Sequence, residues 1–223
     1  MATGPRLAIL GKQGAGKGTQ AARLARHYAI PHISTGDMFR AELRSGSEPG
    51  RLLNKYMKTG DLIPDDVVNE VVKHRLETDG TKDTGFILDG FPRTTNQAEA
   101  LFELLAPAEL DMAIDLQAPT DVALRRLAGR RVCQDCGANH HVDHPPKVDW
   151  TCDVCGGEVI QREDDTEEAI GRRLSLYEKE TEPLIAWYLC RDKLVTVDGM
   201  GTQDTVTTRL VRAIDRRLER AAP

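Results

Sequence analysis

The sequence predicts an α/β fold in which a parallel sheet of about five strands is covered by helices on both faces. Short, nearly continuous apolar runs alternate with longer stretches of helical periodicity, and this alternation is typical of βαβ units. A glycine-rich turn follows the first apolar run, and a cysteine-rich insertion interrupts the pattern later in the chain. Together these observations predict a three-layer core that carries one inserted subdomain.

The expected strands are the short apolar runs, at residues 7–10, 32–33, 86–88, 112–116 and 194–197. The stretches at 19–28, 64–77 and 96–105 have apolar residues at the spacing of helices that bury one face. A further helical stretch, EPLIAWYLC, ends at Cys190, where we expect a buried and unreactive thiol.

The insertion covers residues 129–165. It has no helical period, and glycine, proline and cysteine dominate it. We expect a helix before it at 121–128 and another after it that begins near Thr166, with Asp165 or Thr166 as the N-cap. The core is then formed by residues 1–128 and 166–223.

Composition excludes several classes of function. The chain has 223 residues and a formal net charge of −5, which disfavours binding to nucleic acid or to an anionic membrane. No apolar run approaches the roughly 18 residues of a membrane span, and the first residues lack a cleavable signal pattern. Five cysteines, an odd number, disfavour a secreted disulfide framework. We therefore expect a cytoplasmic protein.

The glycine-rich turn GKQGAGKGT, residues 11–19, lies between the first strand and the first helix. Glycines let the backbone wrap closely around a phosphate, and the helix N-terminus adds a positive dipole. Lys17 would reach the outer phosphates of a nucleotide. A tight βα turn without a ligand is the alternative. Because GTPases, motors and kinases all use such a loop, it does not by itself define the function.

More specific motifs follow the later strands and flank the insertion. They are STGDMFR at 34–40, DGFPR at 89–93 with Gln97 beyond it, LRRLAGRR at 124–131, QREDD at 161–165 and GRRL at 171–174. In this order they cover nearly the whole chain, and the sequence resembles the adenylate kinases, specifically their long-lid bacterial form with a zinc-bearing lid. The resemblance implies a P-loop NTPase-like three-layer fold, an AMP-binding segment at 34–63 and a lid at 129–165.

The resemblance also assigns residues to the reversible, Mg²⁺-dependent transfer of a phosphoryl group from ATP to AMP, which gives two ADP. ATP would contact Gly14, Ala15, Gly16, Lys17, Gly18, Thr19, Arg130, His140 and Gly201. AMP would contact Thr35, Arg40, Asp61, Leu62, Ile63, Gly90, Phe91, Pro92, Arg93, Gln97, Arg162 and Arg173. The catalytic set would be Lys17, Asp89, Arg93, Arg130, Arg162 and Arg173, with Arg126 as a further candidate.

Individual roles follow from the same resemblance. Arg40 and Arg93 would hold the AMP phosphate, Thr35 would contact the adenine, and Gln97 would read the adenine edge by paired hydrogen bonds. Asp89 would orient the waters of the Mg²⁺ ion. The family usually has Tyr-His where this chain has His140 and His141, which makes selectivity for the donor base an open question.

Three carboxylates of these motifs have structural interpretations. We expect Asp37 to be the N-cap of the helix that follows it rather than a ligand contact. Asp164 and Asp165 are expected to pair with lid arginines or to cap the following helix.

Two Cys-x-x-Cys pairs in the insertion predict a metal site. Cys133, Cys136, Cys152 and Cys155 suit a closed tetrahedral Zn²⁺ site, which is structural because no coordination position is left for a substrate. The alternative ligands are His140, His141 and His144. The insertion holds four Lys and Arg against eight Asp and Glu, so its surface repels a nucleic-acid backbone. We therefore expect zinc to hold a mobile lid in shape.

Two other functions remain open at this point. One is a kinase for another nucleoside monophosphate, such as UMP or CMP, or one that uses GTP as donor. The other is a nucleotide-binding switch with a zinc-ribbon interaction module. The phosphotransferase needs only ATP, AMP and ADP as partners, and we expect a monomer.

Overall fold

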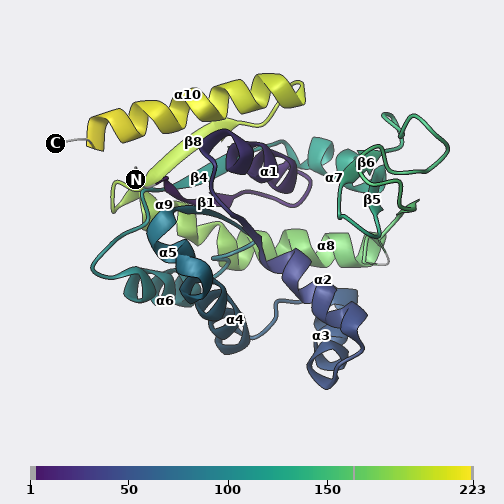
Figure 1. Cartoon of the computed structure of the whole chain (residues 1–223), viewed down its shortest axis with the longest axis horizontal. Coiled ribbons are helices and arrows are strands. Elements are labelled where there is room, and N and C mark those ends of the chain that lie inside the picture. Colours follow the sequence, from purple (N-terminus) through teal and green to yellow (C-terminus); the bar gives the residue numbers. More distant parts are fainter. Residues whose placement is uncertain (1–3, 163, 222–223) are drawn as a thin grey trace.

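The computed structural model describes residues 4–162 and 164–221. Its main sheet has five parallel strands in the order β2-β3-β1-β4-β8 (Figure 1). The strands are β1 (Arg6–Leu10), β2 (His32–Ser34), β3 (Phe86–Asp89), β4 (Met112–Gln117) and β8 (Leu194–Asp198). Each strand contains one of the five apolar runs, so the predicted parallel sheet is confirmed.

Alternating side chains of β1 supply the two apolar layers. Leu7 and Ile9 pack in a cluster with α1 (Lys17–Tyr28) and α10 (Gln203–Ala221). Ala8 and Leu10 pack in a second cluster with α4 (Asp65–Glu77), α6 (Thr95–Leu105) and α9 (Pro183–Leu189). All four side chains are at most 2% exposed. The strand pleat thus divides one short sequence between both faces of the sheet, which gives the expected three layers.

Further helices and short turns connect the strands of the main sheet. Helices α2 (Thr35–Ser45) and α3 (Glu48–Thr59) follow β2 and project away from the sheet (Figure 1). Short turns η1 (Thr78–Gly80) and α5 (Thr81–Thr84) lead into β3. Helix α8 (Glu167–Leu176) continues through a single π-helical turn, η2 (Tyr177–Thr181), to α9.

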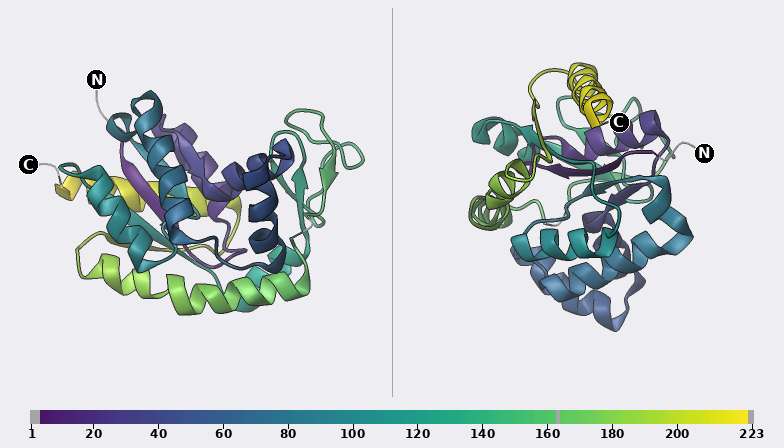
Figure 2. Two further views of the ribbon diagram at one scale, coloured as in Figure 1. Left: turned by 90° about the horizontal axis from the view of Figure 1, so that it is seen from below. Right: turned by 90° about the vertical axis from the view of Figure 1, so that its left-hand side faces the viewer.

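The insertion folds as a small antiparallel sheet. Strands β5 (Arg130–Cys133), β6 (Asn139–His141) and β7 (Val159–Ile160) pair in the order β6-β5-β7. It leaves the core after α7 (Thr120–Ala128) and stands apart from the main sheet (Figure 2). Its buried cluster consists of Cys133, Cys152 and Val159, which is a small core for a unit of this length.

Thr166 caps α8, since its side chain accepts a hydrogen bond of 3.2 Å from the Ala169 N–H. Thr166 was one of the two predicted caps, and Asp165 instead pairs with Arg130. The expectation for Asp37 was wrong. Ser34 is the N-cap of α2 and accepts from the Asp37 N–H, because the helix begins three residues earlier than expected.

The expectation of a buried thiol at Cys190 was also wrong, because this residue is exposed. Helix α9 buries the face that carries Leu184 and Tyr188, which are 0% and 3% exposed. Cys190 lies two residues beyond Tyr188, on the opposite side of the helix. Within the described residues, no helix combines the length and the apolar character needed to cross a membrane.

Candidate nucleotide-binding site

The phosphate loop, residues 11–19, joins β1 to α1 against β4 and α7. Gly11 and Gly14 have φ angles of +138° and +84°, which side chains rarely adopt. A Cβ atom on Gly11 would lie 2.4 Å from the Leu116 carbonyl oxygen, and one on Gly14 would lie 2.3 Å from that of Ala123. Both positions therefore require glycine, and the loop packs directly on its neighbours.

Lys17, the first residue of α1, reaches back across this loop. Its Nζ donates to the carbonyl oxygens of Gly11 at 2.7 Å and Lys12 at 3.0 Å. Burial lowers the pKa of Lys17 to about 8, although the Asp89 carboxylate acts in the opposite direction. A phosphate bound by the loop would restore a favourable environment for this ammonium group.

Arg126 connects the phosphate loop to the loop after β8. It donates from Nη1 to the Ala15 carbonyl and from Nη2 to the Gly199 carbonyl, both at 3.2 Å. Two regions expected to bind ATP, the phosphate loop and the segment around Gly201, are thus brought together. His140 lies in β6 opposite Arg131, and no described contact joins it to the phosphate loop.

A cleft of about 600 Å³, partly open to solvent, lies beside the phosphate loop. Nine of the residues expected to bind AMP line this acceptor cleft: Thr35, Arg40, Asp61, Leu62, Ile63, Gly90, Arg93, Gln97 and Arg173. Six further residues line it: Gln13, Gly36, Phe39, Met57, Val68 and Asp164. Gln13 belongs to the phosphate loop and also lines the cleft, so the loop forms part of the cleft wall.

Three residues of the expected AMP set, Phe91, Pro92 and Arg162, do not line the cleft. Phe91 is 2% exposed and packs in the core cluster below the sheet. Within the DGFPR motif, Phe91 therefore packs in the core and anchors the turn, while Gly90 and Arg93 line the cleft. Of the six unexpected residues, Met57 and Val68 come from α3 and α4, and no motif near them in the sequence marks them as cleft residues.

Arg93 is held in place by the turn that it ends. Its Nε donates to the Gly90 carbonyl at 2.9 Å, and Thr35 Oγ1 donates to the same oxygen at 3.0 Å. Gly90 has a φ of +81°, and a Cβ atom there would lie 2.8 Å from Thr35 Oγ1. Burial lowers the pKa of the Arg93 guanidinium. A buried, oriented cation of this kind is suited to binding a phosphate.

Gln97 is 1% exposed and has polar partners at both ends of its amide. Oε1 accepts from the Arg93 N–H at 2.8 Å, and Nε2 donates to Asp65 Oδ1 at 2.6 Å. One N–H and one lone pair of this amide remain available, as reading an adenine edge requires.

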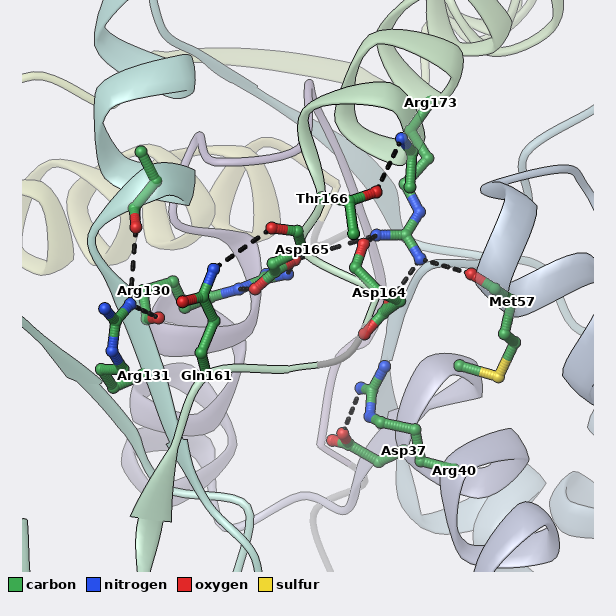
Figure 3. A network of polar contacts seen from close by, with 12 residues as sticks. Asp37, Arg40, Met57, Arg130, Arg131, Gln161, Asp164, Asp165, Thr166 and Arg173 are labelled. Atoms are coloured by element: carbon green, nitrogen blue, oxygen red, sulfur yellow. Dashed lines mark hydrogen bonds and ion pairs between the residues drawn. The ribbon is translucent and has the colours of Figure 1, made fainter.

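Carboxylates hold two of the expected catalytic arginines (Figure 3). Arg130 binds both oxygens of Asp165 through Nε and Nη2, and Arg173 binds Asp164 through its carboxylate and its carbonyl. The neighbouring arginines lower the pKa of Asp164 although burial acts to raise it. Arg173 also donates to the Met57 carbonyl at 3.1 Å, which ties α8 to α3. Asp165 thus pairs with a lid arginine, as predicted, whereas the partner of Asp164 is Arg173 of the core helix α8.

Arg162 differs from these arginines. Its Nε is buried and has no hydrogen-bond partner among the described residues. Burial, together with Arg130 and Arg40 nearby, lowers its pKa to about 10. Asp164 and Asp165 act in the opposite direction, but the buried Nε would still gain a hydrogen-bond partner from a bound anion.

Asp89 ends β3 next to the first turn of α1. Its Oδ2 would lie 3.2 Å from a Cβ atom on Gly18 and lies 3.6 Å from His32 Nε2. The carboxylate therefore points toward the residue after Lys17. Mg²⁺ binds hard carboxylate oxygens, and the waters bound to the ion donate hydrogen bonds to such oxygens.

The four cysteines of the insertion form one cluster. The Sγ atoms of Cys133, Cys136, Cys152 and Cys155 all lie within 4.8 Å of one another. Gly137 and Gly156, with φ of +72° and +78°, close the turn after each pair, and their N–H groups donate to the carbonyls of Cys133 and Cys152. Four sulfurs at this spacing fit a tetrahedral metal site.

Comparison with known proteins gives a consistent result over almost the whole chain. A family model described as Adenylate kinase matches residues 9–193. An adenylate kinase of Streptomyces avermitilis is 46% identical over 215 residues, which cover 95% of this chain and 97% of that protein. One of Acidothermus cellulolyticus is 48% identical over 212 residues, 94% of this chain and 97% of that protein. These matches do not favour the alternative kinase or the nucleotide switch.

Proposed function

The chain belongs to the adenylate kinase family and transfers a phosphoryl group from ATP to AMP, and we propose that the residues described above do so by positioning and electrostatic stabilisation. The observation that best supports this mechanism is that the phosphate loop forms part of the wall of the acceptor cleft. The acceptor cleft presents Arg40, Arg93 and Arg173, so an acceptor phosphate bound there would lie beside the donor phosphates.

No general base is needed for this reaction. The attacking atom is an oxygen of the AMP phosphate, which already carries negative charge. Lys17, Arg93, Arg130, Arg162 and Arg173 would surround the phosphoryl group as it moves and stabilise the charge of a loose transition state. The Nε of Arg162 has no hydrogen-bond partner in the described part of the chain, and this supports the role because the transferred group would supply one.

The carboxylates that hold Arg130 and Arg173 have a complementary role. Asp165 and Asp164 keep these guanidinium groups oriented and compensated within the protein. Each guanidinium has five N–H donors, so a bound phosphate can be accommodated without breaking every protein contact. We propose that the aspartates position the arginines and do not touch the reacting atoms.

Asp89 is the residue that fits Mg²⁺ with ATP. Its carboxylate faces the first turn of α1, next to Lys17 and Gly18. Bound there through water, the ion would neutralise charge on the donor phosphates. We propose that Asp89 orients those waters and that Lys17 holds the phosphates.

We propose that the four-cysteine cluster binds zinc and that the metal stabilises the lid. The lid has a small apolar core, and a structural metal supplies the folding free energy that such a core lacks. A lid held rigid in this way could move as one body and bring Arg130 and Arg162 onto the phosphates. Its closure would also exclude water, which competes with AMP as acceptor.

We further propose that the protein acts as a cytoplasmic monomer without nucleic-acid or membrane partners. Both nucleotide sites are supplied by one chain, so no partner residue is required. The acidic balance of the chain supports the same view.

The direct test mixes the zinc-loaded protein with ATP, Mg²⁺ and one monophosphate at a time, and follows diphosphate formation. AMP should give rapid turnover to ADP. Comparable turnover with UMP or CMP would preserve the mechanism but overturn the choice of acceptor. No transfer to any acceptor from folded protein would overturn the proposed function.

A further inference from the structure

The amide of Gln97 is fixed in one of its two possible orientations. Its Oε1 accepts from the backbone N–H of Arg93 at 2.8 Å, and its Nε2 donates to Asp65 Oδ1 at 2.6 Å. A backbone N–H can only donate and an ionised carboxylate can only accept. Rotating the amide by half a turn would place donor against donor and acceptor against acceptor. Both partners therefore disfavour the rotated amide.

The carboxylate of Asp65 is itself held in position by a second hydrogen bond. Its second oxygen, Oδ2, accepts from Thr94 Oγ1 at 2.7 Å, and Thr94 is the N-cap of α6, the helix that carries Gln97. Asp65 is the first residue of α4. The carboxylate thus spans α4 and α6, and both of its oxygens have partners.

The orientation of this amide matters because Gln97 lines the acceptor cleft. The Watson–Crick edge of adenine carries an amino donor at C6 and an acceptor at N1. A 6-oxopurine such as hypoxanthine carries the reverse, an acceptor at C6 and an N–H donor at N1. An amide can pair with either edge, provided that it can rotate to exchange its donor and acceptor.

We propose that Asp65 is the positioning residue that makes the acceptor site reject 6-oxopurine monophosphates. By holding Gln97 in one orientation, it allows pairing with AMP and forces an unpaired or repulsive contact with IMP or GMP. The proposal rests on the proposed function, in which the adenine of AMP meets Gln97. A site of this kind discriminates strongly, because the wrong base leaves buried polar groups unpaired.

The test compares kcat/KM for AMP and for IMP, with ATP as donor, in five proteins. These are the wild type, Asp65→Ala, Asp65→Ser, Asp65→Asn and Asp66→Ala. Asp65→Ala offers Gln97 no partner, and the hydroxyl of Asp65→Ser and the amide of Asp65→Asn can each donate or accept. Asp66→Ala is the matched control, because it removes an exposed carboxylate from the same first turn of α4.

We expect Asp65→Ala, Asp65→Ser and Asp65→Asn to raise kcat/KM for IMP itself, and the IMP-to-AMP ratio by at least about tenfold. The wild type and Asp66→Ala should keep the low ratio. Thermal unfolding followed by circular dichroism checks that each variant is folded. If Asp65→Ala does not fold, the comparison with the wild type is made with Asp65→Ser.

Three outcomes would overturn the proposal. One is an unchanged ratio in both Asp65→Ala and Asp65→Ser. Another is a ratio that rises only because AMP turnover falls, which would indicate a purely structural role. The third is Asp65→Asn keeping the low ratio, because a side chain of the same shape that can donate to a rotated Gln97 would then leave the specificity unchanged. Failure of the wild type to use AMP would instead overturn the proposed function.

Discussion

Arg130 and Asp165 form a two-point ion pair where the lid joins α8. The carboxylate of Asp165 is completely buried and the Arg130 side chain is 18% exposed. Removing one partner of a buried pair leaves the other charge without compensation, and this costs about 3–5 kcal/mol. The pair therefore both orients a residue of the proposed catalytic set and makes the junction of lid and core sensitive to mutation.

Asp165→Ala should consequently lower the free energy of unfolding by about 3 kcal/mol and reduce turnover. Urea unfolding measures the first effect. Asp121→Ala is the matched control, since Asp121 pairs with Arg125 in α7 with both side chains more than 70% exposed. An exposed pair contributes less than about 1 kcal/mol. Equal losses from the two variants would contradict the assignment of a buried pair.

Arg93→Ala should abolish most turnover while the protein stays folded. The guanidinium faces the acceptor cleft from the turn after β3, and its loss removes stabilisation of the migrating charge. We expect kcat/KM to fall by about a thousandfold or more. Arg125→Ala, on the exposed side of α7, should leave the rate unchanged. A variant that loses only AMP affinity, with kcat preserved, would show that Arg93 binds the ground state alone.

Lys17 should make the free energy of unfolding rise with pH between about 8 and 10.5. Its pKa in the folded protein is about 8, against an ordinary value of 10.5. Between these values the unfolded chain binds a proton that the folded protein does not, so this contribution to the free energy of unfolding rises with pH. Below about pH 8 the charged, buried ammonium is unfavourable. Urea unfolding of the wild type and Lys17→Met should therefore differ in favour of the variant at pH 7, and this difference should shrink by pH 10.

The same pKa predicts weaker ATP binding in alkaline solution. Bound phosphates should raise the pKa of Lys17, because an adjacent anion favours the charged form. ATP affinity measured by calorimetry should accordingly fall as the pH rises above 8. Lys17→Arg, which stays charged, should show a flatter profile over the same range even if its affinity is lower. A profile as steep as that of the wild type would assign the titration to another group.

Removal of zinc should lower thermal stability and turnover together. Chelation at neutral pH should release about one metal ion per chain, since four thiolates complete one tetrahedral site. Cys152→Ser should reproduce both effects, because Cys152 belongs to the buried cluster of the lid. Cys190→Ser is the control, as that thiol is exposed and lies outside the cluster. Unchanged stability and activity after metal removal would contradict a structural role.

Residues close in sequence to a glycine turn or a cysteine pair could be predicted well. The phosphate loop, the DGFPR turn and the four cysteines each depend on local spacing, which the sequence states directly. The cleft-lining positions of Met57 and Val68 depend on how α3 and α4 are turned toward β2 and β3. That orientation is set by tertiary packing, which no local pattern records.

The errors have the same physical origin. Asp37 has the chemistry of an N-cap, but Ser34 precedes it and can fill that role first. Cys190 follows an apolar stretch, yet only one face of α9 is covered by the core. In both cases the local sequence correctly indicated a helix. Which side chain caps that helix, or is buried beneath it, was decided by neighbouring residues.

Helix α8 touches both parts of the molecule that flank the acceptor cleft. Its N-terminus continues directly from the lid, while Arg173, two turns along, holds the Met57 carbonyl of α3. We expect α8 to couple the lid mechanically to the proposed AMP-binding segment, so that movement of one would shift the other. ATP and AMP would then each alter the affinity for the other nucleotide, and by the same factor in both directions.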